Sequence, residues 1–241
     1  MTPTLKSPAS RRLSRFLRPA AYLAVLVILA GIGLRAMPSA AEDAPKIPQP
    51  TLDETANPAA SSETIVLAGG CFWGVQGVFQ HVQGVTSAVS GYAGGEKNTA
   101  QYETVSSGTT GHAESVQVTF DPRKITLGRI LQIYFSVAHD PTELNYQGPD
   151  VGTQYRSMVE YTNDAQKAEV TTFVNQLTKD HAWGGRPIVT QIVPLKNFFP
   201  AEAYHQHYAE IHPNEPYIAY NDRPKVENLK KQFPQLYRDI K

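Results

Sequence analysis

The chain has 241 residues, with 22 Lys plus Arg and 22 Asp plus Glu, so it carries no formal net charge when its histidines are neutral. This balance excludes the broad basic field with which proteins hold nucleic acid phosphates, and we expect no nucleic acid partner. A hydrophobic content of 41% is enough to build a sizeable core. The length favours one folded domain with additional segments.

The N-terminal segment has the pattern of an export signal. Basic residues precede an uncharged run from Ala20 to Leu34, and small residues follow at Ser39-Ala40-Ala41. We therefore predict a signal peptide over residues 1–41 and a periplasmic or otherwise extracytoplasmic location. The apolar run is shorter than the roughly 20 residues of a membrane-spanning helix, and an uncleaved membrane anchor is the alternative.

The next segment, residues 42–62, is rich in Pro, Ala, Ser, Thr and Asp and has no apolar periodicity. This composition predicts a flexible, solvated linker. We place the folded domain at residues 63–241.

The domain begins with a predicted strand, a tight turn and a helix. Thr64 to Ala68 is a short apolar run closed by Gly69-Gly70, and apolar residues then recur at helical spacing from Val75 to Val82. Apolar residues alternate in a second strand from Val116 to Phe120. Thr126 is placed to cap a helix that runs to about Ala138.

The second half of the domain predicts further elements of both kinds. A long irregular segment from His139 to Gly152 is of a length that more often serves function than simple connection. Tyr155 to Tyr161 predicts a strand, Asp164 a helix cap with a helix to about Asp180, and Ile188 to Val193 another apolar run. This order predicts an α+β fold, a single two-layer domain with helices packed on a mostly antiparallel mixed sheet.

Cys71 is the only cysteine, so no intrachain disulfide can form and its thiol is free. It follows the Gly69-Gly70 turn and lies at the first turn of the predicted helix. There the unpaired N–H groups and the helix dipole favour an anion, so we expect a lowered thiol pKa and a nucleophilic role. A buried, inert core cysteine is the alternative interpretation.

Five blocks in a fixed order point to one family. They are Gly70-Cys71-Phe72-Trp73-Gly74, Gly91-Tyr92-Ala93-Gly94-Gly95, Gly111-His112-Ala113-Glu114, His139-Asp140-Pro141-Thr142 and Gln154-Tyr155-Arg156-Ser157. Together they resemble the peptide methionine sulfoxide reductases of the A type, from about Ile65 to Tyr208. The resemblance implies a ferredoxin-like core and reduction of the S epimer of methionine sulfoxide, protein-bound or free.

The resemblance also implies roles for site residues. Cys71 would attack the sulfoxide sulfur and become a sulfenic acid, and Glu114 would protonate the departing oxygen. Tyr102 and Tyr155 would donate hydrogen bonds to that oxygen, and Asp150 would orient the polar side of the site. Phe72 and Trp73 would hold the substrate methyl group.

Many members of that family carry further cysteines near the C-terminus, and this sequence does not. We therefore expect no bound cofactor and an external thiol reductant, either a thioredoxin-like protein or a small dithiol. The expected substrates include oxidised exported proteins.

Two other functions are compatible with single features. A Cys-His hydrolase would pair Cys71 with His112 or His139, since a neighbouring base activates a thiol. A metal-binding module would use Glu202 with His205, His207 and His212, but helical spacing puts only Glu202 and His205 on one face. We expect no bound metal.

Overall fold

The structure, a computed structural model, describes residues 44–53 and 60–240. The strands are β1 (Glu63–Ala68), β2 (Val85–Ala93), β3 (Ala113–Phe120), β4 (Tyr146–Gln147), β5 (Asp150–Val151), β6 (Met158–Tyr161), β7 (Gln191–Pro194) and β8 (Phe198–Pro200). The α-helices are α2 (Phe72–Gln80), α3 (Tyr102–Val105), α4 (Leu127–Ile133), α5 (Asp164–Lys179), α6 (Tyr208–Ile211) and α7 (Arg223–Gln232).

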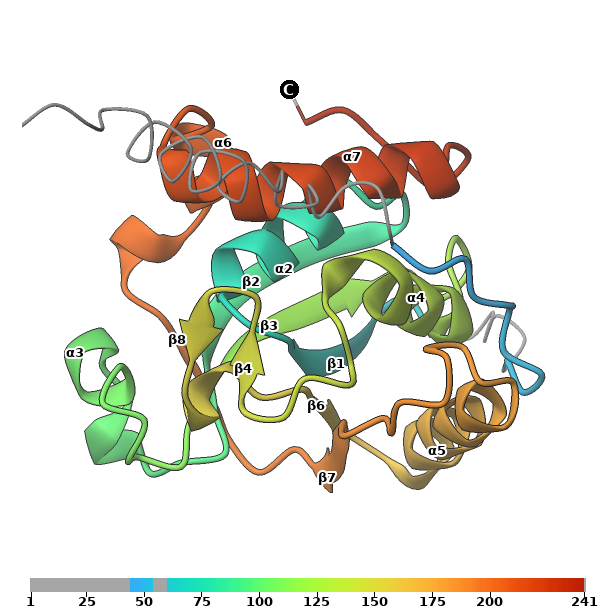
Figure 1. Ribbon diagram of the computed structural model, residues 1–241, viewed down its shortest axis with the longest axis horizontal. Helices are drawn as coiled ribbons and strands as arrows, with labels where there is room; N and C mark the ends of the chain where they lie inside the picture. The colour runs from blue at the N-terminus through green and yellow to red at the C-terminus, as the bar shows by residue number, and fades with distance from the viewer. Residues whose placement is uncertain (1–43, 54–59, 241) are drawn as a thin grey trace, which may run out of the picture. The chain divides into compact units, whose positions relative to one another are not determined.

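Six strands form one sheet in the order β7-β6-β1-β3-β2-β8 (Figure 1). All neighbouring pairs are antiparallel except β6 and β7, which are parallel. The inner order β6-β1-β3-β2, with α2 between β1 and β2 and α4 between β3 and β6, is the ferredoxin-like arrangement. The predicted α+β domain with a mostly antiparallel mixed sheet is confirmed.

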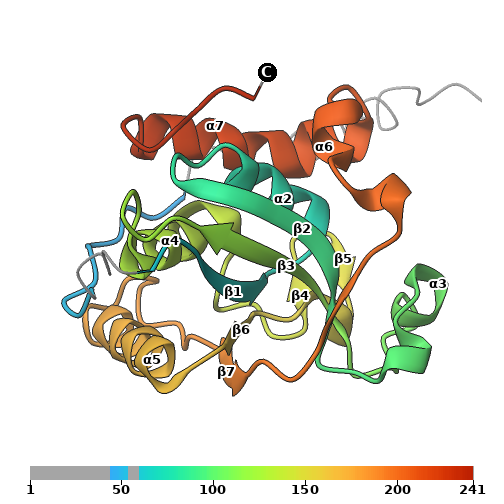
Figure 2. The ribbon, with the colours of Figure 1, turned by 180° about the vertical axis from the view of Figure 1, so that it is seen from behind.

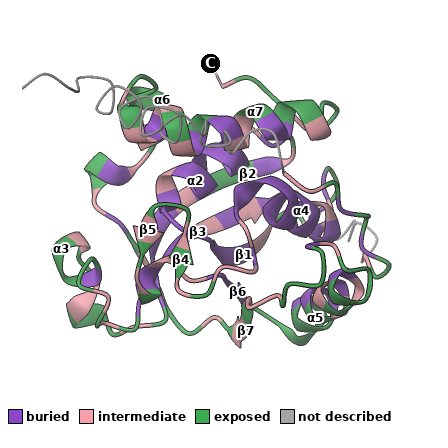
Figure 3. Ribbon diagram, in the orientation of Figure 1, coloured by how far each residue is buried: buried purple, intermediate pink, exposed green. Residues whose placement is uncertain are grey.

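The main core lies between the sheet and its helices. Ile65 and Leu67 of β1 face this core, whereas Val66 and Ala68 belong to a smaller cluster on the other face, because strand side chains alternate. That second cluster is covered by Val193, Leu195 and Phe198 near β7 and β8. Burial on both faces explains why β1 is a continuous apolar run (Figure 3).

Helix α2 lies directly on the sheet, and α7 packs on its outer side in both views (Figures 1 and 2). Val75, Val78 and Phe79 of α2 are buried. This arrangement places the C-terminal helix beside the segment that follows Cys71.

Several predicted boundaries can be compared with the structure. Thr126 caps α4 by accepting a hydrogen bond from the Arg129 N–H, as predicted, and a π-helical turn extends the helix to Ala138. The prediction that Asp164 caps the following helix is wrong by one residue. Asn163 is the N-cap and accepts from the Gln166 N–H, while Asp164 begins α5.

Part of the segment predicted as a solvated linker lies against the domain. Ile47 is buried in the main core, and its carbonyl oxygen accepts a hydrogen bond of 2.9 Å from Gln132. Asp53 accepts hydrogen bonds from the Thr126 hydroxyl and the Gly128 N–H at the start of α4. For residues 44–53 the prediction of a flexible linker is therefore wrong, because these contacts fix them to helices of the domain.

The predicted signal peptide, residues 1–41, lies outside the described residues. Within residues 44–53 and 60–240, no helix is long and apolar enough to cross a membrane.

Candidate active site

Cys71 occupies the N-cap of α2, directly after the turn that closes β1. Gly70 adopts φ +84°, a conformation that favours glycine, and its N–H donates to the Tyr155 carbonyl at 3.2 Å. This bond ties the turn before Cys71 to the loop that carries Tyr155. The thiol is almost buried, since the residue is 8% exposed.

The prediction that the helix start lowers the pKa of Cys71 is wrong. Burial raises the thiol pKa well above its ordinary value, and the charges of Glu114 and Asp222 act in the same direction. A hydrogen bond from the Trp73 backbone and the charge of Lys225 lower it, but by less. Desolvation of the thiolate therefore outweighs the favourable helix N-terminus.

Glu114 lies beside this turn with its carboxyl group buried. It is on the same face of β3 as Val116 and Val118, the face covered by α2, and its Oε2 accepts a hydrogen bond of 3.1 Å from the Phe72 N–H. Burial raises the pKa of Glu114 to about 8, and the charges of Asp150 and Asp222 also raise it. The carboxyl group therefore keeps its proton at neutral pH, the state that a general acid requires.

Tyr102 and Tyr155 lie near both groups. Burial raises the pKa of each phenol, and the charges of Glu114 and Cys71 raise it further. Glu202 positions the Tyr102 backbone, because its Oε1 accepts from the Tyr102 N–H at 3.0 Å. Both phenols therefore remain protonated donors at physiological pH.

Asp150 accepts a hydrogen bond from the Tyr217 hydroxyl. Burial raises the pKa of Asp150, and the bond to Tyr217 and the charge of Lys225 lower it by less. The raised pKa of Tyr217 also reflects the charge of Cys71, so this hydroxyl belongs to the same electrostatic environment as the thiol.

Trp73 is held from three sides. Its indole N–H donates to His205 Nδ1 at 3.2 Å, its ring stacks on Tyr208 with centroids 3.9 Å apart, and Tyr217 meets it edge-on at 6.0 Å. Phe72 is 1% exposed and contacts the Trp73, Tyr92 and His205 rings. The two predicted aromatic residues thus lie beside the thiol, with Trp73 the more exposed.

The histidines required by a hydrolase are engaged elsewhere. His112 Nδ1 accepts from the Gly95 N–H, and its Nε2 lies 3.0 Å from the Glu96 carbonyl oxygen. The ring nitrogens of His139 contact the Tyr134 carbonyl and the Ser157 hydroxyl, and burial lowers its pKa to about 3. Neither ring is free to activate Cys71.

The metal-binding alternative finds no support in the geometry. His205 accepts from Trp73, and His207 lies 3.1 Å from Glu210. In the part of the chain that the structure describes, no three His, Cys, Asp or Glu side chains are placed to hold a metal ion.

The structure thus brings together all seven predicted site residues and adds others that the sequence did not reveal. Tyr217, Asp222 and Lys225 come from the C-terminal segment, to which no motif assigned a role. In the sequence, Tyr217 follows Pro216 in no motif that distinguishes it from an ordinary core tyrosine, so the sequence alone did not identify it as a site residue.

Comparisons with known proteins agree with this geometry. The family model described as peptide methionine sulfoxide reductase matches residues 63–237. A peptide methionine sulfoxide reductase of Mesorhizobium japonicum is 58% identical over 188 residues, which cover 78% of this chain and 95% of that protein. One from Trichodesmium erythraeum is 48% identical, with 71% and 96% covered.

Solved structures show the same fold. The reduced form of Mxr1 from Saccharomyces cerevisiae has a TM-score of 0.59 at 35% identity, covering 68% of this chain and 92% of that one. Methionine sulfoxide reductase A of Corynebacterium diphtheriae has a TM-score of 0.58 at 30% identity, covering 71% and 86%. With the buried thiol and carboxyl group side by side, these matches show that the chain belongs to the peptide methionine sulfoxide reductase family, as an A-type, peptide-methionine (S)-S-oxide reductase that reduces methionine sulfoxide to methionine.

Proposed function

We propose that this enzyme works as an exported single-cysteine reductase, with Cys71 as the nucleophile and Glu114 as the acid. One observation carries the proposal. The Glu114 carboxyl group accepts a hydrogen bond from the backbone N–H of Phe72, the residue directly after Cys71. A carboxyl group whose pKa burial raises to about 8, close to the only thiol of the chain, supports these two roles.

The proposed reaction balances without an outside proton. The Cys71 sulfur attacks the sulfoxide sulfur while Glu114 protonates the sulfoxide oxygen, and the thiol proton restores Glu114. Oxygen passes to Cys71, so the sulfoxide sulfur gains two electrons and the cysteine sulfur loses two. The products are methionine and a Cys71 sulfenic acid.

The remaining site residues would stabilise the oxygen during this transfer. The protonated phenols of Tyr102 and Tyr155 donate toward the developing negative charge. Asp150, held by Tyr217, orients the polar side of the site, and Trp73 with Phe72 accommodates the methyl group.

Reduction of the sulfenic acid requires a separate donor, because the sequence contains no second cysteine. A donor thiol forms a mixed disulfide with Cys71 and releases water, and the donor's second thiol then frees Cys71. A thioredoxin-like protein or a small dithiol supplies both thiols.

The export signal pattern of residues 1–41 supports a periplasmic or other extracytoplasmic location, with oxidised exported proteins as substrates. Fractionation of cells, with N-terminal sequencing of the recovered protein, tests this part. A protein that stays in the cytoplasm with its N-terminus intact would contradict it.

The catalytic proposal is tested by incubating purified full-length protein with each methionine sulfoxide epimer and a chemical dithiol, and measuring methionine. The S epimer should be reduced and the R epimer should not. Cys71→Ser should abolish turnover with the fold intact. Turnover by Cys71→Ser would contradict the assignment of the nucleophile.

A further inference from the structure

An ion pair outside the predicted site lies at the start of α7. Asp222 is 1% exposed, and its Oδ1 accepts a hydrogen bond of 3.2 Å from Lys225 Nζ. Its other oxygen, Oδ2, is buried and has no hydrogen-bond partner among the described residues. The Lys225 side chain is 18% exposed, so the pair is largely removed from water.

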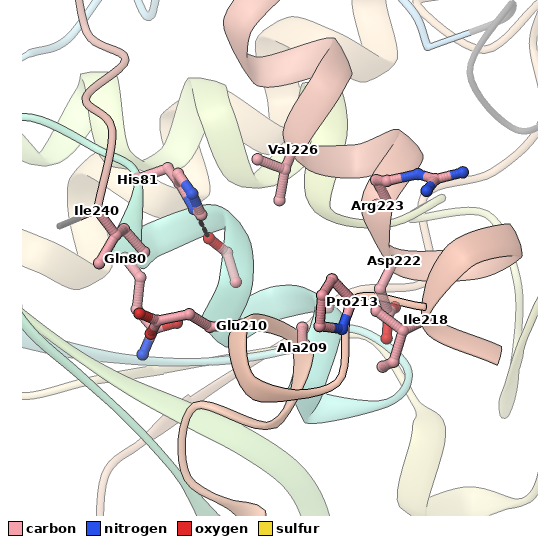
Figure 4. A pocket seen from close by; sticks show the side chains of 12 residues that line it. Gln80, His81, Ala209, Glu210, Pro213, Ile218, Asp222, Arg223, Val226 and Ile240 are labelled. Carbon is pink, nitrogen blue, oxygen red and sulfur yellow. Dashed lines mark hydrogen bonds between the residues drawn. The ribbon is translucent and has the colours of Figure 1, made fainter. Parts of the chain in front are cut away.

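This pair packs directly on the helix that Cys71 begins. A Cβ atom added to Gly74, in the first turn of α2, would lie 2.1 Å from Asp222 Oδ1 and 2.7 Å from Lys225 Nζ. Only glycine leaves room for the two charges there. On its outer side Asp222 lines a cavity of about 250 Å³ between α2, α6 and α7 (Figure 4).

The two charges act on the reacting groups. Asp222 raises the pKa of both Cys71 and Glu114, and Lys225 lowers that of Cys71, although burial is the largest cause for each. The titratable groups that surround the pair and the thiol are Cys71, Tyr102, Glu114, His139, Glu143, Asp150, Tyr155, Glu215 and Tyr217. Among the groups that shift the Cys71 pKa, Lys225 is the cation.

We propose that Asp222 and Lys225 form a positioning pair that balances the charge behind Cys71 and Glu114, and thereby sets the pH range in which the enzyme reduces its substrate. This inference rests on the proposed roles of Cys71 and Glu114. The pair acts from behind the first turn of α2, where both side chains lie against Gly74.

The pair also serves as an anchor between α7 and α2, and a purely structural role is the alternative. The opposite charges of Asp222 and Lys225 allow an experiment to distinguish the electrostatic role from the structural one. Loss of the Asp222 charge should favour the Cys71 thiolate, and loss of the Lys225 charge should disfavour it. Structural damage would change Cys71 in the same direction in both variants.

The test uses the rate of Cys71 alkylation by a small reagent, which reports one residue because the chain has one cysteine. Below the thiol pKa this rate follows the thiolate fraction. A neighbouring charge shifts a pKa by about one unit or more, so Asp222→Asn should raise the rate about tenfold and Lys225→Met should lower it about tenfold. Burial raises the pKa of Asp222, and the charge and hydrogen bond of Lys225 lower it. The rates are therefore compared at alkaline pH, which favours the ionised Asp222 carboxyl group.

Three further variants complete the design. Asp222→Asn combined with Lys225→Met should return the rate to near that of the native protein, and Lys225→Arg should retain it. Lys231→Met removes an exposed charge from the same helix and should change nothing. Thermal unfolding verifies the fold of each variant. If Asp222→Asn does not fold, the comparison of Lys225→Met with Lys225→Arg still tests whether the charge at position 225 controls the alkylation rate.

The reductase step supplies a second readout. Asp222→Asn lowers the pKa of Glu114, so the alkaline decline of single-turnover methionine release should move to lower pH. Alkylation rates that stay within about twofold, or move in the same direction in both single variants, would overturn the pair's role. Because alkylation needs no reductase activity, shifted alkylation without methionine release would refute the proposed function and not the pair.

Discussion

Burial raises the pKa of both Cys71 and Glu114, which suits the proposed acid but not the proposed nucleophile. It keeps a proton on Glu114, as the proposed acid needs, but it also keeps one on Cys71, the proposed nucleophile, whose thiolate is its more reactive form. An arrangement in which the thiol proton replaces the one that Glu114 donates resolves this conflict. The buried site then needs no free thiolate before the substrate arrives.

Replacing Glu114 with Gln removes the acid but keeps the shape and the acceptor for the Phe72 N–H. General acid catalysis typically contributes about 10²–10⁴-fold, so we expect single-turnover methionine release to slow by that range. Glu160→Gln is the matched control, since Glu160 is buried on β6 and takes no part in the site. An unchanged rate in Glu114→Gln would show that another group is the acid.

The pH dependence of the same step follows from the Glu114 pKa. The active form of Glu114 is protonated, so the rate should hold below a pH of about 8 and decline as the pH rises through that value. Single-turnover rates measured from neutral to alkaline pH test this expectation. In Glu114→Gln this decline should disappear, and a decline that persists there would assign it to a different group.

Tyr217 is predicted to matter through Asp150. Tyr217→Phe removes the hydroxyl that donates to the Asp150 carboxylate, and such bonds to charged groups contribute about 1.5–3 kcal/mol. We expect the reductase step to slow by roughly tenfold to a hundredfold, from the same range. Tyr220→Phe, a change at a residue that is 77% exposed, should leave the rate unchanged. Equal effects in both variants would exclude a specific role for Tyr217.

At the scale of elements, apolar periodicity predicted β1, β3, β6, β7 and the helices α2, α4 and α5, but it did not predict β2, β8 or α7. β1, β3 and α4 follow their patterns closely, because each places its apolar residues on a face that the core covers. The failure in residues 44–53 has a physical cause. That segment is held by the buried side chain of Ile47, by backbone carbonyls and by Asp53, and such isolated contacts leave no apolar period.

Contacts that leave no pattern in the sequence also limited the prediction of the site. Motif resemblance identified the residues of the N-terminal half and of the loop before β6. It missed Tyr217, Asp222 and Lys225, because their importance arises only when α7 packs against α2. The thiol pKa was also mispredicted, since desolvation depends on the packing around Cys71 and not on its position at a helix start.

The segment before β1 should stabilise the domain through α4. Asp53→Ala removes the acceptor for the Gly128 N–H and the Thr126 hydroxyl, a loss comparable to that of a helix cap, about 1 kcal/mol. Urea unfolding should show this decrease in the free energy of unfolding, with reductase activity unchanged. Lys46→Ala, at an exposed position of the same segment, should have no effect. Equal stability of both variants would mean that the segment contributes nothing.

At the scale of the whole molecule, the site is assembled from segments far apart in the sequence. The β1–α2 turn supplies Cys71, β3 supplies Glu114, the β4–β5 region supplies Asp150, and the C-terminal segment supplies Tyr217. Because no single element contains the site, local unfolding of α7 should disturb the thiol as well. The arrangement of the site therefore depends on the packing of these segments against one another.

The single cysteine limits what the molecule can do without a donor. In the proposed cycle the oxidising equivalent resides on Cys71 after one turnover, and the sequence offers no second thiol to take it up as a disulfide. Purified protein mixed with excess methionine sulfoxide and no reductant should release about one methionine per chain and stop, with Cys71 open to a sulfenic-acid trap. Addition of a dithiol or a thioredoxin-like protein should restart turnover. Two or more methionines per chain without reductant would contradict the one-cysteine cycle, because only slower overoxidation of Cys71 could store a second equivalent.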